Sequence, residues 1–200
     1  MFITVEGIDG CGKSTQLRLL AAFLEQRGIE AVLTREPGGT KLGERVRQLL
    51  LTPTQDPMTQ TAELLLYAAA RAELVAKVIR PALARDKVVL CDRFSDSTVA
   101  YQVWGRGLDA AWVETVLLGA TGGLKPDLTL LFDLPPELAL KRSARTDRLE
   151  QEGLEFFTRV RNGYLTLAQK EPERIVVISA EPTPDVVHSQ VRCQIERYLL

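Results

Sequence analysis

Residues 2–15, FITVEGIDGCGKST, decide the fold of this chain. The apolar run at 2–5 has the length of a buried strand and is too short for a helical stripe. The chain then turns at glycine, and residues 7–14 match the pattern G-x-x-x-x-G-K-[ST]. Because a strand precedes this pattern and an amphipathic helix follows it, the segment predicts a loop that binds the phosphates of a nucleotide.

The chemistry of this loop predicts a site for a nucleoside triphosphate with Mg²⁺. Glycines allow backbone N–H groups to converge on phosphate oxygens, and the helix that begins near Lys13 adds the positive end of its dipole. We expect Lys13 to reach the β- and γ-phosphates and Ser14 to bind the Mg²⁺ that bridges them. The loop residues expected to bind this triphosphate, ATP if the resemblance described below holds, are Gly7, Ile8, Asp9, Gly10, Cys11, Gly12, Lys13, Ser14 and Thr15.

The rest of the chain alternates apolar strands with amphipathic helices. Residues 17–24 carry apolar side chains at helical spacing before Gly28, and residues 29–33 predict a second strand. A strand, a helix and a strand in so short a span predict a parallel crossover. Three further strands are expected at 87–91, 128–134 and 174–179. We therefore expect an α/β fold of the P-loop NTPase type, with three layers and a five-stranded parallel sheet covered by helices on both faces.

Further helical stretches lie between these strands. They are expected at 42–51, at 59–85 with Pro81 interrupting late, from Asp109, from Glu137, across 154–167, and from Pro184 after an N-cap at Thr183. No linker, repeat or low-complexity run separates one part of the sequence from another. We expect residues 1–200 to form a single domain.

The composition is that of an ordinary globular protein. Of the 200 residues, 46% are hydrophobic and 26% are charged, and the formal net charge is −1. Lys and Arg do not gather into one basic block, which argues against nucleic acid as the main partner. No apolar run has the length of a membrane span, so no membrane partner is expected. The three cysteines are odd in number and lack metal-type spacing, which favours a reducing, cytoplasmic location.

Charged residues follow two of the expected strands. Residues 34–40, TREPGGT, follow the second strand, and Asp92 and Arg93 follow the third. Ligands of open parallel sheets bind beyond the carboxyl ends of the strands, so we expect both segments to face the phosphate loop, with a surface turn as the alternative for 34–40. Asp92 is suited to hold the magnesium shell, and Arg93 can neutralise a phosphate. The polar stretch 95–102 offers groups for a sugar or base.

Tyr67 and Arg71 lie four residues apart on the helix expected at 59–85, so they share one face. An aromatic ring and an arginine in this arrangement can stack on a base and hydrogen-bond its edge. Spacing alone favours another interpretation, in which a core tyrosine stands beside a solvated arginine.

A dense basic stretch follows the helix expected from Glu137. It contains Lys141, Arg142, Arg145 and Arg148, and no apolar stripe continues through it. One interpretation is a solvated charged face. In an enzyme that transfers phosphoryl groups, the stretch is better explained as a mobile lid, about 141–153, that brings arginines to the phosphate and excludes water.

These segments, in their order along the chain, resemble bacterial thymidylate kinase, a family in the nucleoside-monophosphate kinase branch of phosphate-loop enzymes. The matching motifs are VEGIDGCGKST, TREPGGT, LLLYAAARAEL, CDRFSDSTVAYQ followed by GRG, KPDLTLLFDL and DRLEQEGLEFFTRVRNGY. The resemblance covers nearly the full length. The phosphate loop is shared with many families, whereas TREPGGT together with DRF and SxxxYQ is far more specific.

The resemblance implies roles in binding dTMP. Tyr67 stands where the family has an aromatic that stacks on thymine, and Arg71 where an arginine binds the base, which reverses the preference from spacing. The other positions implied at dTMP are Asp9 near the 3′-hydroxyl, Glu36 beside the monophosphate, Arg93 at the acceptor phosphate, and Thr98, Tyr101 and Gln102 at the nucleoside. Asp92 is implied at the metal.

The resemblance also bears on the lid arginines. Some members carry a catalytic arginine within the phosphate loop, and residues 8–11 here contain none. The lid is then implied to neutralise the transition-state charge, with Arg148 as the first choice and Arg145 as the second. Arg142 is expected to contact ATP.

The implied activity is Mg²⁺-dependent transfer of the γ-phosphoryl group of ATP to dTMP, giving dTDP for dTTP synthesis, by a homodimer. Lys13, Asp92, Arg93 and a lid arginine would act by positioning and charge neutralisation. One alternative is a kinase for another nucleoside or nucleoside monophosphate. A second is a GTP-hydrolysing switch, but the sequence has no N-K-x-D element, and Asp92 is followed by Arg-Phe-Ser instead of x-x-Gly.

Overall fold

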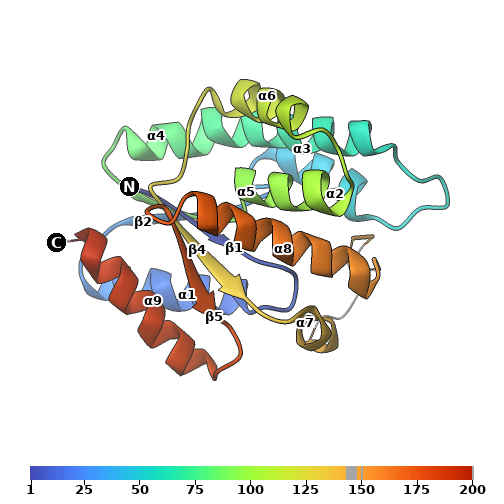
Figure 1. Cartoon of the computed structure of the whole chain (residues 1–200). Coiled ribbons are helices and arrows are strands. Elements are labelled where there is room, and N and C mark those ends of the chain that lie inside the picture. Colours follow the sequence, from blue (N-terminus) through green and yellow to red (C-terminus); the bar gives the residue numbers. More distant parts are fainter. Residues whose placement is uncertain (143–147, 150, 200) are drawn as a thin grey trace.

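Five strands of the chain pair in parallel, in the order β2-β3-β1-β4-β5 (Figure 1). The structure, a computed structural model, describes residues 1–142, 148–149 and 151–199. The strands are β1 (Phe2–Glu6), β2 (Ala31–Arg35), β3 (Val88–Asp92), β4 (Leu128–Asp133) and β5 (Ile175–Ser179). The predicted five-stranded parallel sheet is therefore confirmed. The second strand lies further along the chain than predicted, so that Arg35 ends it.

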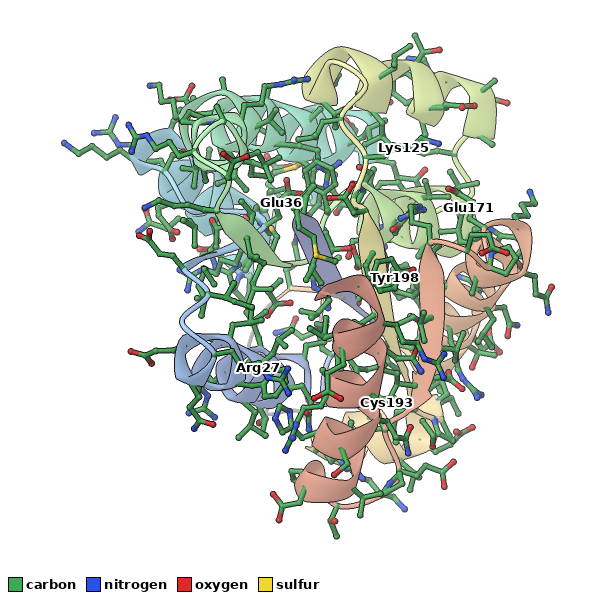
Figure 2. The ribbon with its side chains drawn as sticks, turned by 90° about the vertical axis from the view of Figure 1, so that its left-hand side faces the viewer. Arg27, Glu36, Lys125, Glu171, Cys193 and Tyr198 are labelled. Carbon is green, nitrogen blue, oxygen red and sulfur yellow. The ribbon has the colours of Figure 1, made fainter. Side chains whose placement is uncertain are left out.

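Two helices cover one face of the sheet. They are α1 (Lys13–Gln26), which follows the phosphate loop, and α9 (Pro184–Leu199), and they lie side by side in Figure 1 and Figure 2. Arg27, labelled in Figure 2, ion-pairs with Glu196 of α9 at 2.5 Å. This face carries the apolar residues expected of the buried sides of both helices, among them Leu20, Leu24, Val191 and Ile195.

The remaining helices pack on the opposite face and beyond it (Figure 1). They are α2 (Lys41–Leu51), α3 (Gln60–Leu74), the π-helical turn η1 (Val75–Ile79), α4 (Arg80–Leu83), α5 (Ser95–Thr98), the π-helical turn η2 (Val99–Gly105), α6 (Ala110–Thr121) and α8 (Leu154–Lys170). The short α7 (Pro136–Arg142) follows β4 at the carboxyl edge of the sheet. Helices on both faces of a parallel sheet make the three-layer α/β fold of P-loop NTPases.

Two π-helical turns lie in stretches that the sequence describes only as helical or polar. The helix expected at 59–85 continues through η1 and ends at Leu83, with Pro81 in the first turn of α4. The polar stretch 95–102 begins a helix that continues into η2 and ends at Gly105. At Gly163 of α8, a side chain would meet the ring of Trp104, so η2 and α8 approach closely. This packing fixes the segment that carries Thr98, Tyr101 and Gln102.

The helices among the described residues include none with the length and apolar character needed to cross a membrane.

Candidate active site

Two pockets join at the carboxyl edge of the sheet. The loop pocket, with an empty volume of about 970 Å³, is lined by Asp9, Gly10, Gly12, Lys13, Ser14, Thr15, Arg35, Glu36, Arg47, Asp92 and Arg93. The inner pocket, of about 540 Å³, is lined by Asp9, Glu36, Pro37, Arg47, Leu51, Tyr67, Arg71, Arg93, Ser97, Thr98, Tyr101, Gln102 and Leu149. Asp9, Glu36, Arg47 and Arg93 line both pockets. Arg47 and Arg93 therefore lie at the junction of the two pockets.

The phosphate loop is held by its own backbone and by Lys13. Nζ of Lys13 donates hydrogen bonds to the carbonyl oxygens of Gly7 at 3.0 Å and Ile8 at 2.9 Å. At Gly10, which has a φ of 82°, a side chain would meet the carbonyl oxygen of Ala139 on α7. Only glycine fits this position without displacing α7. Of the loop residues, Asp9, Gly10 and Gly12 to Thr15 line the loop pocket.

Cys11 and Ile8 point away from the loop pocket. Their side chains are buried among the apolar residues of the core. Burial raises the pKa of the Cys11 thiol, which disfavours the thiolate that a nucleophile needs.

Ser14 and Asp92 come together at the floor of the loop pocket. Oγ of Ser14 donates a long hydrogen bond to Oδ2 of Asp92 at 3.4 Å. Within the described part of the chain, Oδ1 of Asp92 is buried and has no hydrogen-bond partner. The same part of the chain has no cluster of three or more His, Cys, Asp or Glu residues that could hold a metal by itself. A hydroxyl and a carboxylate next to a phosphate loop fit Mg²⁺, which takes few protein ligands and is bound mainly by phosphates and water.

Arg93 is held at the junction of the pockets by several partners. Its Nη2 donates to Oδ1 of Asp9 at 2.7 Å, and its Nη1 donates to the carbonyl oxygen of Gly7 at 3.0 Å. Burial alone would raise the pKa of Asp9, but the charges of Arg93 and Lys13 outweigh it and lower the pKa to about 2. Asp9 therefore stays ionised at neutral pH and keeps the guanidinium in place.

The inner pocket contains a buried ion pair. Nε of Arg71 donates to Oε2 of Glu36 at 2.8 Å, Nη2 contacts the same oxygen, and Nη1 donates to Oγ1 of Thr98 at 2.9 Å. Arg71 is 1% exposed and Glu36, labelled in Figure 2, is 5% exposed. Helical spacing places Arg71 on the same helix face as Tyr67, but it does not reveal that Arg71 pairs with Glu36, which is distant in the sequence. The interpretation of Arg71 as a solvated arginine is therefore wrong.

We predict that Arg71→Met lowers the free energy of unfolding by about 3–5 kcal/mol, because it leaves the Glu36 carboxyl buried without its partner. Urea unfolding measures the change. The matched control is Arg35→Met, which breaks the exposed pair of Arg35 with Glu44 at 3.0 Å and is expected to cost about 1 kcal/mol or less. Equal losses in the two variants would contradict the assignment of a stabilising role to the buried pair.

Two of the predicted lid arginines, Arg142 and Arg148, lie in the described part of the chain and have different partners. Arg142 donates to the carbonyl oxygen of Ala180 at 3.2 Å, just beyond β5. Arg148 donates to the carbonyl oxygen of Leu50 at 2.9 Å and ion-pairs with the buried Glu63. Glu63 also accepts a hydrogen bond from Gln102 at 3.0 Å, so Arg148 is tied to the inner-pocket side of the cleft and not to the phosphate loop. Arg145 lies outside the described residues.

All eight side chains predicted to contact dTMP line the inner pocket: Asp9, Glu36, Tyr67, Arg71, Arg93, Thr98, Tyr101 and Gln102. Sequence reasoning missed Arg47, which lines both pockets and is held through a hydrogen bond to the carbonyl oxygen of Pro37 at 3.0 Å. It also missed Glu6, a fully buried acid at the end of β1. The only signal for Glu6 was an acidic residue at the end of a mostly apolar strand.

A phosphate loop on a parallel sheet, joined to a second pocket with arginines at the junction, defines a P-loop kinase that acts on a small phosphorylated acceptor. Comparison with known proteins narrows this class.

Residues 5–191 match the family model described as Thymidylate kinase. The thymidylate kinase of Desulfosudis oleivorans is 55% identical over 190 residues, covering 90% of this chain and 89% of the relative. That of Pseudomonas putida is 53% identical over 194 residues, covering 96% and 92%. The crystal structure of thymidylate kinase from Ehrlichia chaffeensis matches with a TM-score of 0.82 at 38% identity, covering 98% of both chains. The chain belongs to the thymidylate kinase family, and it is therefore an enzyme, a kinase that uses ATP to phosphorylate dTMP to dTDP.

Proposed function

We propose that the loop pocket binds ATP with Mg²⁺, that the inner pocket binds dTMP, and that the γ-phosphoryl group crosses at Arg93. The observation that carries this proposal is the continuity of the two pockets through Asp9, Glu36, Arg47 and Arg93. In-line transfer needs donor and acceptor phosphates end to end, and it needs cations at the point where negative charge develops. The continuity of the two pockets and the arginines at their junction, Arg47 and Arg93, favour such an arrangement.

The residues around the donor act by charge and position. Lys13 releases the loop carbonyls in exchange for the β- and γ-phosphate oxygens, which are stronger acceptors. Ser14 and the unpaired oxygen of Asp92 would hold the Mg²⁺, which when bound neutralises phosphate charge and orients the donor.

The residues around the acceptor hold it without a general base. The 5′-phosphate of dTMP is already an anion, so no side chain has to remove a proton from it before transfer. Arg93 and Arg47 bind this phosphate, and Asp9 contacts the 3′-hydroxyl of the sugar. Tyr67 packs on thymine, and Arg71, Thr98, Tyr101 and Gln102 surround the base and sugar in the inner pocket.

We assign Arg142 to the ATP side, because it ends α7, whose Ala139 packs against Gly10 of the phosphate loop, and it donates to Ala180 just beyond β5. The contacts of Arg148 with Glu63 and Leu50 favour a role in shaping the inner pocket. Arg145 remains the candidate lid arginine for the transition state. The segment predicted as the lid, 141–153, includes residues outside the described ranges, and a single domain over 1–200 stays a prediction.

Initial rates of ADP formation with dTMP, dUMP, dCMP, AMP and thymidine test the proposed function. The highest kcat/KM is expected with dTMP. Thymidine should give no turnover, because it lacks the phosphate that the two junction arginines bind. A higher kcat/KM for another monophosphate would contradict the assignment of the inner pocket to dTMP.

We also propose a homodimer in the cytoplasm. The outer surfaces of α3 and α6, which pack together, expose Leu65 at 49% and Leu118 at 62%. Two large apolar side chains on neighbouring helices favour contact with a second copy of the chain.

We predict that Leu118→Glu converts the dimer to a monomer, because it places a charge in this apolar contact. Light scattering after size exclusion gives the molar mass. The matched control is Val186→Glu, which changes an exposed residue of α9. Helix α9 lies on the opposite side of the sheet from α6, so this variant should leave the dimer intact (Figure 1). A monomeric parent protein would rule out the dimer itself.

A further inference from the structure

Glu6 is a buried acid with a complete set of contacts. It ends β1 and is 0% exposed. Its Oε1 accepts the N–H of Phe94 at 2.7 Å. Its Oε2 accepts from Oγ of Ser97 at 2.6 Å and from the hydroxyl of Tyr164 at 2.9 Å.

These contacts close a ring of three oxygens. The hydroxyl oxygens of Ser97 and Tyr164 also lie 2.7 Å apart, so each of the three oxygens is within hydrogen-bond distance of the other two. Each contact needs one hydrogen, and the two hydroxyls supply one each. If Glu6 were ionised, one short O···O contact would lack a hydrogen. With Glu6 protonated, Oε2 donates to one hydroxyl, that hydroxyl turns to donate to the other, and the second hydroxyl donates to Oε2, so every contact in the ring is a hydrogen bond.

Arg93 rests on this ring. Its Nη1 donates to Oγ of Ser97 at 3.2 Å and to the hydroxyl of Tyr164 at 3.2 Å. The two hydroxyls thus separate the guanidinium from the Glu6 carboxyl. With Glu6 protonated, each hydroxyl donates within the ring and accepts from Arg93, so the position of Arg93 depends on the ring.

We propose that Glu6 is a positioning residue for phosphoryl transfer, a buried carboxylic acid that holds Ser97 and Tyr164, and through them Arg93, as long as it carries a proton. This proposal rests on the proposed function, in which Arg93 meets the transferring phosphoryl group.

The charges around Glu6 agree with a protonated acid. The titratable groups that face it are Cys91 and Arg93 from β3 and the following residue, Asp96 from α5, and Tyr164 from α8. Burial, and then the charge of Asp96, raise the pKa of Glu6 from 4.5 to about 7, against the opposing charge of Arg93. Asp96 is itself paired with Arg174 at 2.7 Å and stays fixed nearby.

The consequence is a loss of activity as pH rises. An acid whose pKa is raised in the folded protein keeps its proton below that pKa and loses it above. Each contact of the ring therefore has a hydrogen below about pH 7, and one contact lacks its hydrogen above that pH. An ionised Glu6 also attracts Arg93 away from Asp9. The kcat for dTMP phosphorylation is therefore expected to fall on the alkaline side of this pKa.

Glu6→Gln and Glu6→Ala test the proposal through kcat at saturating dTMP, from about pH 6 to about pH 9. In Glu6→Gln the amide oxygen can accept the Phe94 N–H. Its NH₂ group can donate to Ser97 and to Tyr164, whereas the protonated acid donates to one of them, so every contact of the ring keeps a hydrogen without a titratable group. This variant should keep kcat within a few-fold and lose the alkaline fall. Glu6→Ala should lose kcat on the order of 10²-fold, since a small displacement of Arg93 suffices for that. A Gln variant as impaired as the Ala variant would overturn the proposal, and so would an Ala variant with the parent kcat.

A second measurement does not depend on activity or on the Ala variant folding. The infrared difference spectrum between the parent and Glu6→Gln, without nucleotides, should contain the C=O band of a protonated carboxylic acid, and this band should disappear as pH rises. Absence of the band across the range overturns the proposal even if dTMP kinase activity is normal. If the band is present and dTMP is not phosphorylated, the protonated state of Glu6 stands and the proposed function fails.

Discussion

Replacing Arg93 by Met is expected to lower the kcat for dTMP phosphorylation by about 10³-fold or more. Arg93 lines both pockets and is fixed there by Asp9 and the carbonyl oxygen of Gly7. A cation at this point stabilises the charge that develops on the phosphoryl group during transfer, and Met fills a similar volume without charge. Single-turnover rates with preformed enzyme, ATP and Mg²⁺ measure the chemical step directly.

The matched control is Arg159→Met. Arg159 donates to the carbonyl oxygen of Gly105 at 3.1 Å and lies among the lining residues of neither pocket. Its kcat should stay within a few-fold of the parent. An Arg93→Met enzyme with near-parent single-turnover rates would show that the junction cation is not needed, provided that its thermal unfolding matches the parent.

Replacing Lys13 by Ala is expected to lower kcat by about 10²- to 10³-fold and to weaken ATP binding, because the variant removes the only lysine side chain among the residues that line the loop pocket. The affinity for dTMP should change little, because Lys13 does not line the inner pocket. Steady-state kinetics with ATP varied, together with calorimetric titration of dTMP, separates the two effects.

Lys125→Ala is the control for this substitution. Lys125, labelled in Figure 2, is exposed, and its Nζ lies 3.9 Å from Oε2 of Glu171. It is remote from both pockets, so its replacement should leave the kinetics unchanged. If Lys13→Ala weakened dTMP binding as much as ATP binding, the division of the cleft into donor and acceptor pockets would be wrong.

The fold was predictable because its signals are local. The run at 2–5 and the glycine pattern at 7–14 identify a strand, a turn and a helix without reference to any other part of the chain. Once a parallel sheet is expected, the ends of its strands must share one edge, and this places Asp92 near Ser14.

The parts of the site that were not predictable depend on contacts between distant segments. The pairing of Arg71 with Glu36 joins α3 to the loop after β2 and turns an apparent surface arginine into a buried one. The π-helical turn η2 has no periodicity of its own in the sequence. The ring at Glu6 needs side chains from β1, α5 and α8, and spacing along one helix reveals none of these relations.

The resemblance to a known family supplied what spacing did not for the acceptor side, since it reversed the preference for Tyr67 and Arg71. Its choice of Arg148 for the transition state stays a prediction. In the structure Arg148 ion-pairs with Glu63 and donates to the carbonyl oxygen of Leu50, two contacts that the sequence did not indicate.

The central claim is that one continuous cleft holds ATP and dTMP with their phosphates end to end. Phosphorus NMR of the parent enzyme with ATP, Mg²⁺ and dTMP tests it most directly. The account predicts that dTDP and ADP form in equal amounts and that inorganic phosphate does not accumulate. Release of inorganic phosphate without dTDP would contradict the account, because the γ-phosphoryl group would then be passing to water and not to the neighbouring nucleotide.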